Sequence, residues 1–449
     1  MLTQNAYGDS RLSLWLRVRE YAVPPSMIEA ATARRRAGDW AGACAAAGFD
    51  VDLDLRALAR THGGLLAARV RADLRHLAPD LLRWHMPRIA PDGLLRPGLT
   101  IPLARYQDGE RSLHLVVRTP PAWADAGQRI SLALWEAGQA AAGAHPHPRP
   151  HRRFRLDLHR HLWDARRADE LRIRSGADRP PAGDRSPDPR CAVGRWPAEA
   201  ELVLRAEGRR SGAVLVRPGA RDPLLVDLTA TGDGSGPPTV RISSLRAEDR
   251  ASRLPVLPDA ATWVLPDLEL LRAGAVTADR LHPLVAAALV PGHVPPDSRR
   301  APGTAGDPRL VECRGARHRI GQVDGILVPL DHGPDEIRRE ELLAALTGTP
   351  LPCLQAIDEV HRRPDCLPGV RERLDHGDTA GALAVVEGLL GPEAVLRDGP
   401  LRDELQAAAE RRIVHGLFRA GLAEPRSRRV PDRGGSRDRR SRPRSATFR

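Results

Sequence analysis

The sequence contains no lysine, so all 69 basic residues of the 449-residue chain are arginines. A P-loop, a pyridoxal-phosphate enzyme and a protein kinase each require a lysine at the reactive centre. The composition therefore excludes these three classes in their usual form. Because lysine codons are AT-rich, the bias also indicates a GC-rich genome, and a high arginine content alone is not a functional signal.

Aromatic residues are scarce as well, at 3% of the chain. A core with so few large rings must be built mainly from Leu, Val and Ala. Long apolar runs are missing, so we expect no membrane-spanning helix, and residues 1–24 show no secretory signal. The five cysteines are irregularly spaced, which favours reduced thiols in a cytoplasmic protein.

The formal net charge of +12 is concentrated near the C-terminus. Residues 425–449 hold ten arginines, two acids and almost no apolar side chains, a composition typical of a disordered tail. Such a tail attracts nucleic acid and other polyanions. The predicted polyanion-binding residues are Arg426, Arg428, Arg429, Arg437, Arg439, Arg440, Arg442 and Arg444. Elsewhere the arginines are interspersed with acids, which predicts an ion-paired surface.

Pro- and Gly-rich stretches divide the chain, because repeated proline forbids helix interiors and central strands. We predict a helical segment with a small antiparallel sheet at 1–142 and an antiparallel β-rich region at 154–289. A β-hairpin with a helical bundle follows at 309–424. The predicted linkers are 143–153 and 290–308, and the disordered tail is 425–449. The fold class is therefore predicted to be α+β.

Hydrophobic periodicity supplies the elements of the first region. Leucines at three- and four-residue steps predict helices within 25–88. Alternating apolar residues then predict strands at 99–106 and 112–119, joined by a turn at Asp108-Gly109. A third strand is predicted at 130–135.

The remaining regions are predicted in the same way. Segments 200–207, 212–218, 223–230 and 240–244 alternate and predict an antiparallel meander. A hairpin between LVECR and GILVPL is predicted within 310–330. The predicted C-terminal helices are 334–348, 353–362, 367–375, 379–390 and 401–422.

One short motif occurs near both ends of the chain. Gly-Asp-x-Ala-Gly-Ala begins at Gly38 and again at Gly377. Each glycine is expected to end one helix, and Asp39 and Asp378 to cap the next, with the Ala-Gly-Ala step letting the two helices approach closely. The motif resembles the inter-helix turn of tetratricopeptide-type helical hairpins, although no 34-residue array is present. Two ordinary helix–turn–helix units explain it equally well.

The N-terminal stretch 18–55 (VREYAVPPSMIEAATARRRAGDWAGACAAAGFDVDLDL) is similar to proteins of high-GC actinobacteria. Those proteins carry no assigned activity. The resemblance therefore implies no catalytic residues for this chain.

A histidine-rich segment, 145–164, is one candidate for chemistry. If it is a strand, Asp157, His159 and His161 point to one face, and two imidazoles two residues apart can converge on a zinc or catalytic metal ion. If it is helical, the histidines diverge. A solvated segment without metal is the simpler interpretation.

Other catalytic signals are weak. Cys353, His361 and Cys366, with Asp365, form a second possible ligand set, but buried reduced thiols explain them better because no CxxC pair exists. No Gly-x-Ser-x-Gly elbow and no dinucleotide fingerprint is present. We expect no cofactor.

These features favour a cytoplasmic interaction or adaptor protein without catalysis of its own, with protein as its main partner. One alternative is a metal-dependent hydrolase centred on residues 157–161. Another is a nucleic-acid-associated protein acting through the basic tail. No membrane association is expected.

Overall fold

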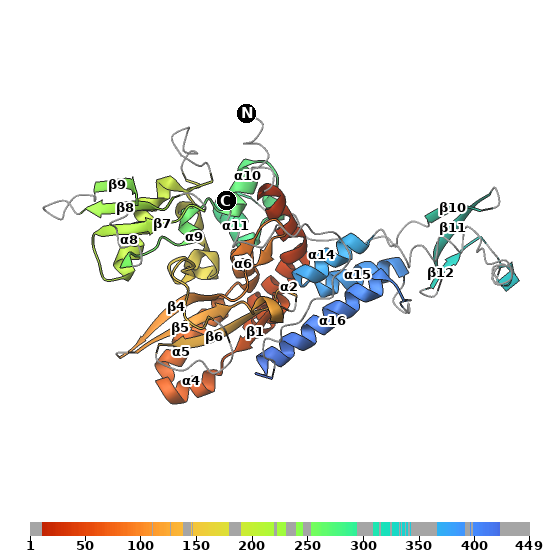
Figure 1. Cartoon of the computed structure of the whole chain (residues 1–449), viewed down its shortest axis with the longest axis horizontal. Helices are drawn as coiled ribbons and strands as arrows, with labels where there is room; N and C mark the ends of the chain where they lie inside the picture. Colours follow the sequence, from red (N-terminus) through yellow and green to blue (C-terminus); the bar gives the residue numbers. More distant parts are fainter. Residues whose placement is uncertain are drawn as a thin grey trace. The chain divides into compact units, whose positions relative to one another are not determined.

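A computed structural model describes most of the chain before residue 294 and parts of the rest. The described residues are 11–109, 111–125, 127–137, 145, 147–178, 190–219, 222–229, 239–245, 253–293, 309–313, 316–323, 326–331, 333, 335–336, 338–339, 342, 366–390, 396 and 398–422. The chain divides into two compact units, Met1–Pro296 with Phe418–Arg449, and Asp297–Leu417. The mixed α+β class is confirmed (Figure 1).

The first unit begins with helices, as the leucine spacing predicts. They are η1 (Val18–Ala22), α2 (Pro25–Arg36), α3 (Trp40–Ala46), α4 (Leu55–His62), α5 (Gly64–His76) and α6 (Pro79–Trp84). One short strand, β1 (Phe49–Asp52), interrupts them. It pairs in parallel with β6 (Ile130–Glu136), about 80 residues later in the chain. A four-residue strand among helices carries too little alternation to be recognised from sequence.

The predicted hairpin is confirmed and forms the edge of the first sheet. Strands β4 (Thr100–Asp108) and β5 (Arg111–Arg118) pair antiparallel, with Asp108 opposite Arg111 and Gly109 at φ 58° in the turn. The sheet order is β1-β6-β5-β4, so β4 is an edge strand. A small ribbon of β2 (Arg88–Ile89) and β3 (Leu94–Leu95) precedes it.

The region after residue 154 is more helical than the alternation predicts. It contains η3 (Leu156–Leu158), η4 (Arg160–Leu162), η5 (Ala165–Glu170), α7 (Leu171–Ser175), η6 (Val193–Arg195), α8 (Trp196–Ala206), α9 (Asp259–Thr262), α10 (Pro266–Arg272), η8 (Ala278–Arg280) and α11 (Pro283–Leu289). The predicted meander is present as β7 (Gly212–Val216), β8 (Leu224–Thr229) and β9 (Thr239–Ser244), paired antiparallel in that order.

The strand predicted at 200–207 is wrong, because these residues belong to α8. Its buried apolar residues are Trp196, Ala200, Val203 and Leu204, at the spacing of one helix face. Ala, Glu and Leu are strong helix formers, and Pro197 sits in the first turn where its missing N–H costs nothing. The helix packs on β7 and β8 (Figure 1).

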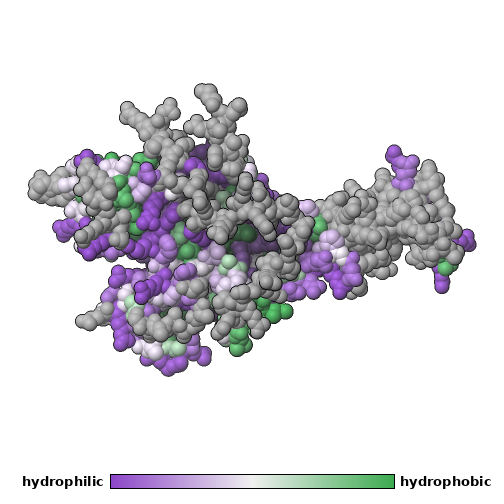
Figure 2. All heavy atoms as spheres, in the orientation of Figure 1, coloured by the Kyte–Doolittle hydropathy of each residue, from purple (hydrophilic) through white to green (hydrophobic). Residues whose placement is uncertain are grey.

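Two apolar clusters stabilise this unit. The larger joins residues from Leu14 to Phe154 with side chains of α10 and α11, such as Leu270 and Val285. The smaller lies between α8 and the β7–β9 sheet, around Trp196 and Val226. Segments more than 200 residues apart therefore share one core. In the view of Figure 2 the described surface is mainly hydrophilic, with apolar residues in small patches.

The second unit contains a three-stranded antiparallel sheet and helices. Its elements are β10 (Arg309–Cys313), β11 (Ala316–Val323), β12 (Ile326–Pro329), α14 (Leu367–His376), α15 (Thr379–Leu390) and most of α16 (Pro400–Arg419). The predicted hairpin of LVECR with GILVPL is wrong because β11 lies between these strands. The last three predicted helices are confirmed within a few residues. Most of 334–348, all of 353–362 and the tail 425–449 lie outside the described residues.

The repeated Gly-Asp motif forms the same cap at both ends. Gly38 and Gly377 have φ of 80° and 85°, and each follows a helix. The Asp39 carboxylate accepts a 2.8 Å hydrogen bond from the backbone N–H of Gly42. Asp378 accepts one of 2.9 Å from Gly381. The predicted helix ends and caps are thus confirmed.

The second glycine of the motif serves the cap. A Cβ at Gly42 would lie 1.9 Å from Asp39 Oδ2, and one at Gly381 would lie 2.1 Å from Asp378 Oδ2. The capping carboxylate is therefore the closest contact at this position. At Gly42 the Arg34 guanidinium of the preceding helix α2 would also lie 2.7 Å from a Cβ, and α2 packs against α3 as α14 packs against α15.

Candidate anion-binding site

The histidine-rich segment is neither a strand nor an α-helix. Residues 156–162 form the two short 3-10 helices η3 and η4. The rings of His159 and His161 lie 5.7 Å apart, centroid to centroid. Asp157 is held by Arg155, at 2.7 Å. Within the described part of the chain, no group of three or more His, Cys, Asp and Glu could hold a metal ion.

His159 instead belongs to a buried ion-pair network, and the buried ring of His161 lies beside it. His159 Nε2 lies 3.2 Å from Glu199 on α8, and its Nδ1 lies 2.9 Å from the backbone oxygen of Arg155. Burial by itself would raise the pKa of Glu199, but hydrogen bonds from His159 and Arg174 lower it to about 2. Burial holds the pKa of His161 well below its usual value. This network ties the 3-10 helices to α8.

The remaining predicted site residues are not placed. Cys353, His361, Asp365 and the tail arginines fall outside the described residues. Cys366 is half-buried just before α14.

Basic side chains gather at a groove of about 710 Å³ in the first unit. None of its fourteen lining residues, all of them described, carries a carboxylate. The basic lining residues are Arg96, Arg149, Arg152, Arg153, Arg217, His147 and His151. A surface this poor in acids differs from the ion-paired surface predicted for the body of the chain.

One wall of the groove is the Pro-rich segment 147–153. It lies along the edge strand β4, where Thr100 Oγ1 donates to the backbone oxygen of His147 at 2.7 Å. The backbone N–H of His151 donates to the oxygen of Thr100 at 2.8 Å. Proline at 148 and 150 fixes the φ of this segment. The stretch predicted to be a linker therefore also holds five basic side chains against the sheet.

A further part of the lining comes from the β7–β9 sheet and the segment bridged to it. Arg217 follows β7 directly, and the last part of β7 is bridged at Leu215 to Val256. The backbone N–H of Asp259 donates to the oxygen of Arg153 at 3.0 Å, which ties this part of the lining to the Pro-rich segment. The groove thus depends on contacts between residues more than 100 positions apart.

The charges in the groove are only partly neutralised. Arg153 donates from Nε to Asp259, and Arg152 donates to the backbone oxygen of Leu254. Within the described chain, Arg96, Arg149 and Arg217 form no ion pair or side-chain hydrogen bond. Burial lowers the pKa of His151, and the charges of Arg96, Arg153 and Arg217 lower it further, so these guanidinium groups surround one position.

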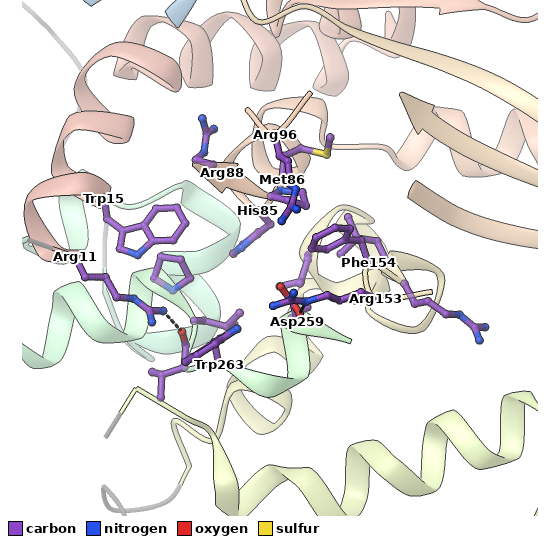
Figure 3. Close-up of a pocket in the computed structure, with 18 residues that line it drawn as sticks. Arg11, Trp15, His85, Met86, Arg88, Arg96, Arg153, Phe154, Asp259 and Trp263 are labelled. Atoms are coloured by element: carbon purple, nitrogen blue, oxygen red, sulfur yellow. Dashed lines mark hydrogen bonds and ion pairs between the residues drawn. The ribbon is translucent and has the colours of Figure 1, made fainter. Parts of the chain in front are cut away.

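A smaller cavity of about 140 Å³ adjoins the groove and shares Arg96 and Arg153 with it. Its aromatic lining residues are Trp15, Phe154 and Trp263, which surround the space in Figure 3 together with His85 and Asp259. Aromatic walls beside a basic groove can accommodate a flat ring next to negative charge.

The polar residues behind the cavity are fixed by buried contacts. Burial lowers the pKa of His85 to about 4, so its ring is neutral near pH 7. Asp267 accepts from Trp84 Nε1 at 2.7 Å and lies 3.2 Å from Arg19. Arg88 donates to the backbone oxygens of Gly93 and Arg83. These hydrogen bonds commit Asp267 and Arg88 to the fold.

Sequence reasoning missed this site although it noted part of it. The histidine-rich segment 145–164, which includes residues 147–153, was interpreted as a possible metal site at Asp157, His159 and His161. Its arginines point to an anion only once Arg96 and Arg217 are known to lie beside them. No sequence pattern links those positions.

Comparison of the chain with protein-family models, with curated proteins and with solved structures finds no match. Among the described helices, none has the length and apolar content needed to cross a membrane.

Proposed function

We propose that this protein binds a phosphate-bearing polyanion in the arginine groove and acts as a binding protein rather than a catalyst. The observation that carries the proposal is the lining itself, five arginines and two histidines without a carboxylate. The proposal keeps the predicted binding role, but it places the main polyanion site in the groove of the first unit and not in the C-terminal tail. The tail would add non-specific attraction.

Phosphate is the favoured anion because of the type of cation. Guanidinium presents a planar fork of donors that matches phosphate oxygens and forms paired hydrogen bonds. Genome bias explains why these cations are arginines and not lysines. It does not explain why acids are absent from the groove while Asp and Glu total 57 in the chain.

Three guanidinium groups are available without breaking an existing contact. Arg96, Arg149 and Arg217 form no ion pair or side-chain hydrogen bond with a described residue. Asp259 attracts Arg96 and Arg217 at longer range, so binding an anion replaces mainly water and counterions. Their mutual repulsion is relieved when an anion enters. A bound polyanion should therefore stabilise the folded first unit.

The test uses the full chain and inorganic tripolyphosphate, with affinity measured by calorimetry at several salt concentrations. Arg96→Gln combined with Arg217→Gln should weaken binding at least tenfold and make it less sensitive to salt. The matched control is Arg36→Gln with Arg71→Gln, two exposed arginines on α2 and α5 that line neither space. Equal affinities of the two double variants would refute the proposal.

A further inference from the structure

The aromatic cavity indicates what the polyanion carries besides phosphate. We infer that the ligand is a nucleotide whose base enters the cavity lined by Trp15, Phe154 and Trp263 while its phosphates lie in the arginine groove. This inference rests on the proposed function. The shared lining residues Arg96 and Arg153 place the two spaces next to each other, as a base and its phosphate require.

Trp15 and Trp263 are each held by a neighbouring side chain, so they can act as stacking platforms. Trp15 is 8% exposed and lies 5.4 Å from the Trp84 ring. Arg11 lies 5.6 Å from the Trp263 ring centroid, and is itself paired with Glu269 at 2.8 Å. Base–aromatic stacking tolerates every base because each has a π-face.

Residues of the groove and residues of the cavity are in direct contact with each other. The His151 ring of the groove lies 4.9 Å from the Phe154 ring of the cavity, tilted by 34°. Arg153, between them in sequence, lines both spaces and pairs with Asp259 (Figure 3). The groove and the cavity are therefore neighbours that share part of their walls.

Asp259 gives the cavity a preference among bases. Its Oδ1 accepts from Arg153, and Oδ2 has no hydrogen-bond partner among the described residues. A carboxylate oxygen accepts from the exocyclic amino group of adenine, cytosine or guanine. Uracil and thymine lack an exocyclic amino group, and their one ring N–H donor is flanked by two carbonyl oxygens, which a carboxylate repels. We therefore expect amino-bearing bases to bind more tightly.

The experiment compares ATP, UTP and inorganic tripolyphosphate on the full chain. ATP should bind at least tenfold tighter than tripolyphosphate, with UTP between them, and ATP should quench tryptophan fluorescence. Trp263→Leu should bring the affinity for ATP down to that for tripolyphosphate, whereas Trp263→Phe should retain most of it. A variant that simply unfolds would lose both ligands and would shift the thermal transition.

The outcomes separate the two claims. Equal affinity for ATP and tripolyphosphate, both weakened by Arg96→Gln with Arg217→Gln, would overturn the base pocket and leave the anion groove standing. No binding of either ligand would overturn both.

A second experiment distinguishes a nucleotide within a nucleic acid from a free nucleotide. It compares the binding of single-stranded dA12 with that of an abasic strand of equal length. A cavity-dependent preference for dA12 over both ATP and the abasic strand identifies nucleic acid, and its absence identifies a free nucleotide.

Discussion

The ring of His151 lies 4.9 Å from the ring of Phe154, and this contact joins the basic groove to the aromatic cavity. The two residues are three positions apart in the chain, at the end of the Pro-rich segment along β4. His151 lines the groove together with arginines, and Phe154 lines the cavity together with tryptophans. A short stretch of backbone therefore positions both halves of the proposed nucleotide site.

Replacing Asp259 should have opposite effects on the two kinds of ligand. Asp259→Asn removes the only carboxylate among the residues of the two spaces, all of them described. Tripolyphosphate should bind severalfold tighter because Arg153 loses its counter-charge. The preference of ATP over UTP should shrink, because an amide can also donate to a carbonyl. Calorimetry with the three ligands measures both effects. An unchanged preference would contradict the assigned role of Asp259.

The basic tail should contribute attraction without selectivity. We expect a full-length variant with Gln at the eight arginines named above to bind tripolyphosphate and ATP more weakly by the same factor. The salt dependence should also become shallower, since fewer counterions are released. The ratio of the two affinities should not change. A variant that loses all binding would place the site in the tail and not in the groove.

The cap of α3 can be tested by a double-mutant cycle. Gly→Ala in a helix normally stabilises by up to about 1 kcal/mol, but a Cβ at Gly42 would displace Asp39 and remove a cap that contributes about 1 kcal/mol. Gly42→Ala alone should therefore change the free energy of unfolding little. In an Asp39→Ala background the same change should stabilise. Gly64→Ala, which meets nothing within 4 Å at the start of α5, is the control.

Denaturant unfolding of these variants measures the cycle. The coupling between positions 39 and 42 should be about 1 kcal/mol. Additive effects of the two changes would show that the cap does not require glycine at position 42.

Glu199 should make the first unit sensitive to acid. The pKa of Glu199 is lowered in the folded state from 4.5 to about 2, so its stabilising contribution is complete above about pH 5 and is lost as pH falls toward 2. The shift corresponds to about 3 kcal/mol, of which about 2 kcal/mol is lost between pH 5 and pH 3.

The comparison uses two glutamates on the same helix. Glu199→Gln should lower the unfolding free energy at pH 7 by several kcal/mol, on the order of 3, because Arg174 and His159 lose a buried partner. The variant should also lose less stability than the wild type on acidification. Glu201→Gln, which removes an exposed pair with Arg205, should leave both quantities almost unchanged. Parallel pH profiles for all three proteins would exclude Glu199 as the acid-sensitive group.

Local sequence signals predicted the elements whose residues lie close together in the chain. The β4–β5 hairpin follows from alternation around Asp108-Gly109. The two Gly-Asp caps follow from turn and capping chemistry within six residues. Helix α8 was misassigned because Leu202 and Leu204 lie two positions apart between the charged residues Glu201 and Arg205, while the buried stripe that includes Trp196 decides its structure. Strand β11 was missed because ARHRIGQV carries few apolar residues.

The sequence by itself determined the α+β composition, the hairpin, the caps and the absence of lysine-based chemistry, because each depends on neighbours in the chain or on composition. Only the tertiary structure decided the site. Arg96, Arg153 and Arg217 meet because the edge of one sheet, a Pro-rich segment and a second sheet are tied together by backbone hydrogen bonds. Electrostatic attraction acts through space and not along the chain, so a groove without acids has no signature in a sequence where arginines and acids are mixed.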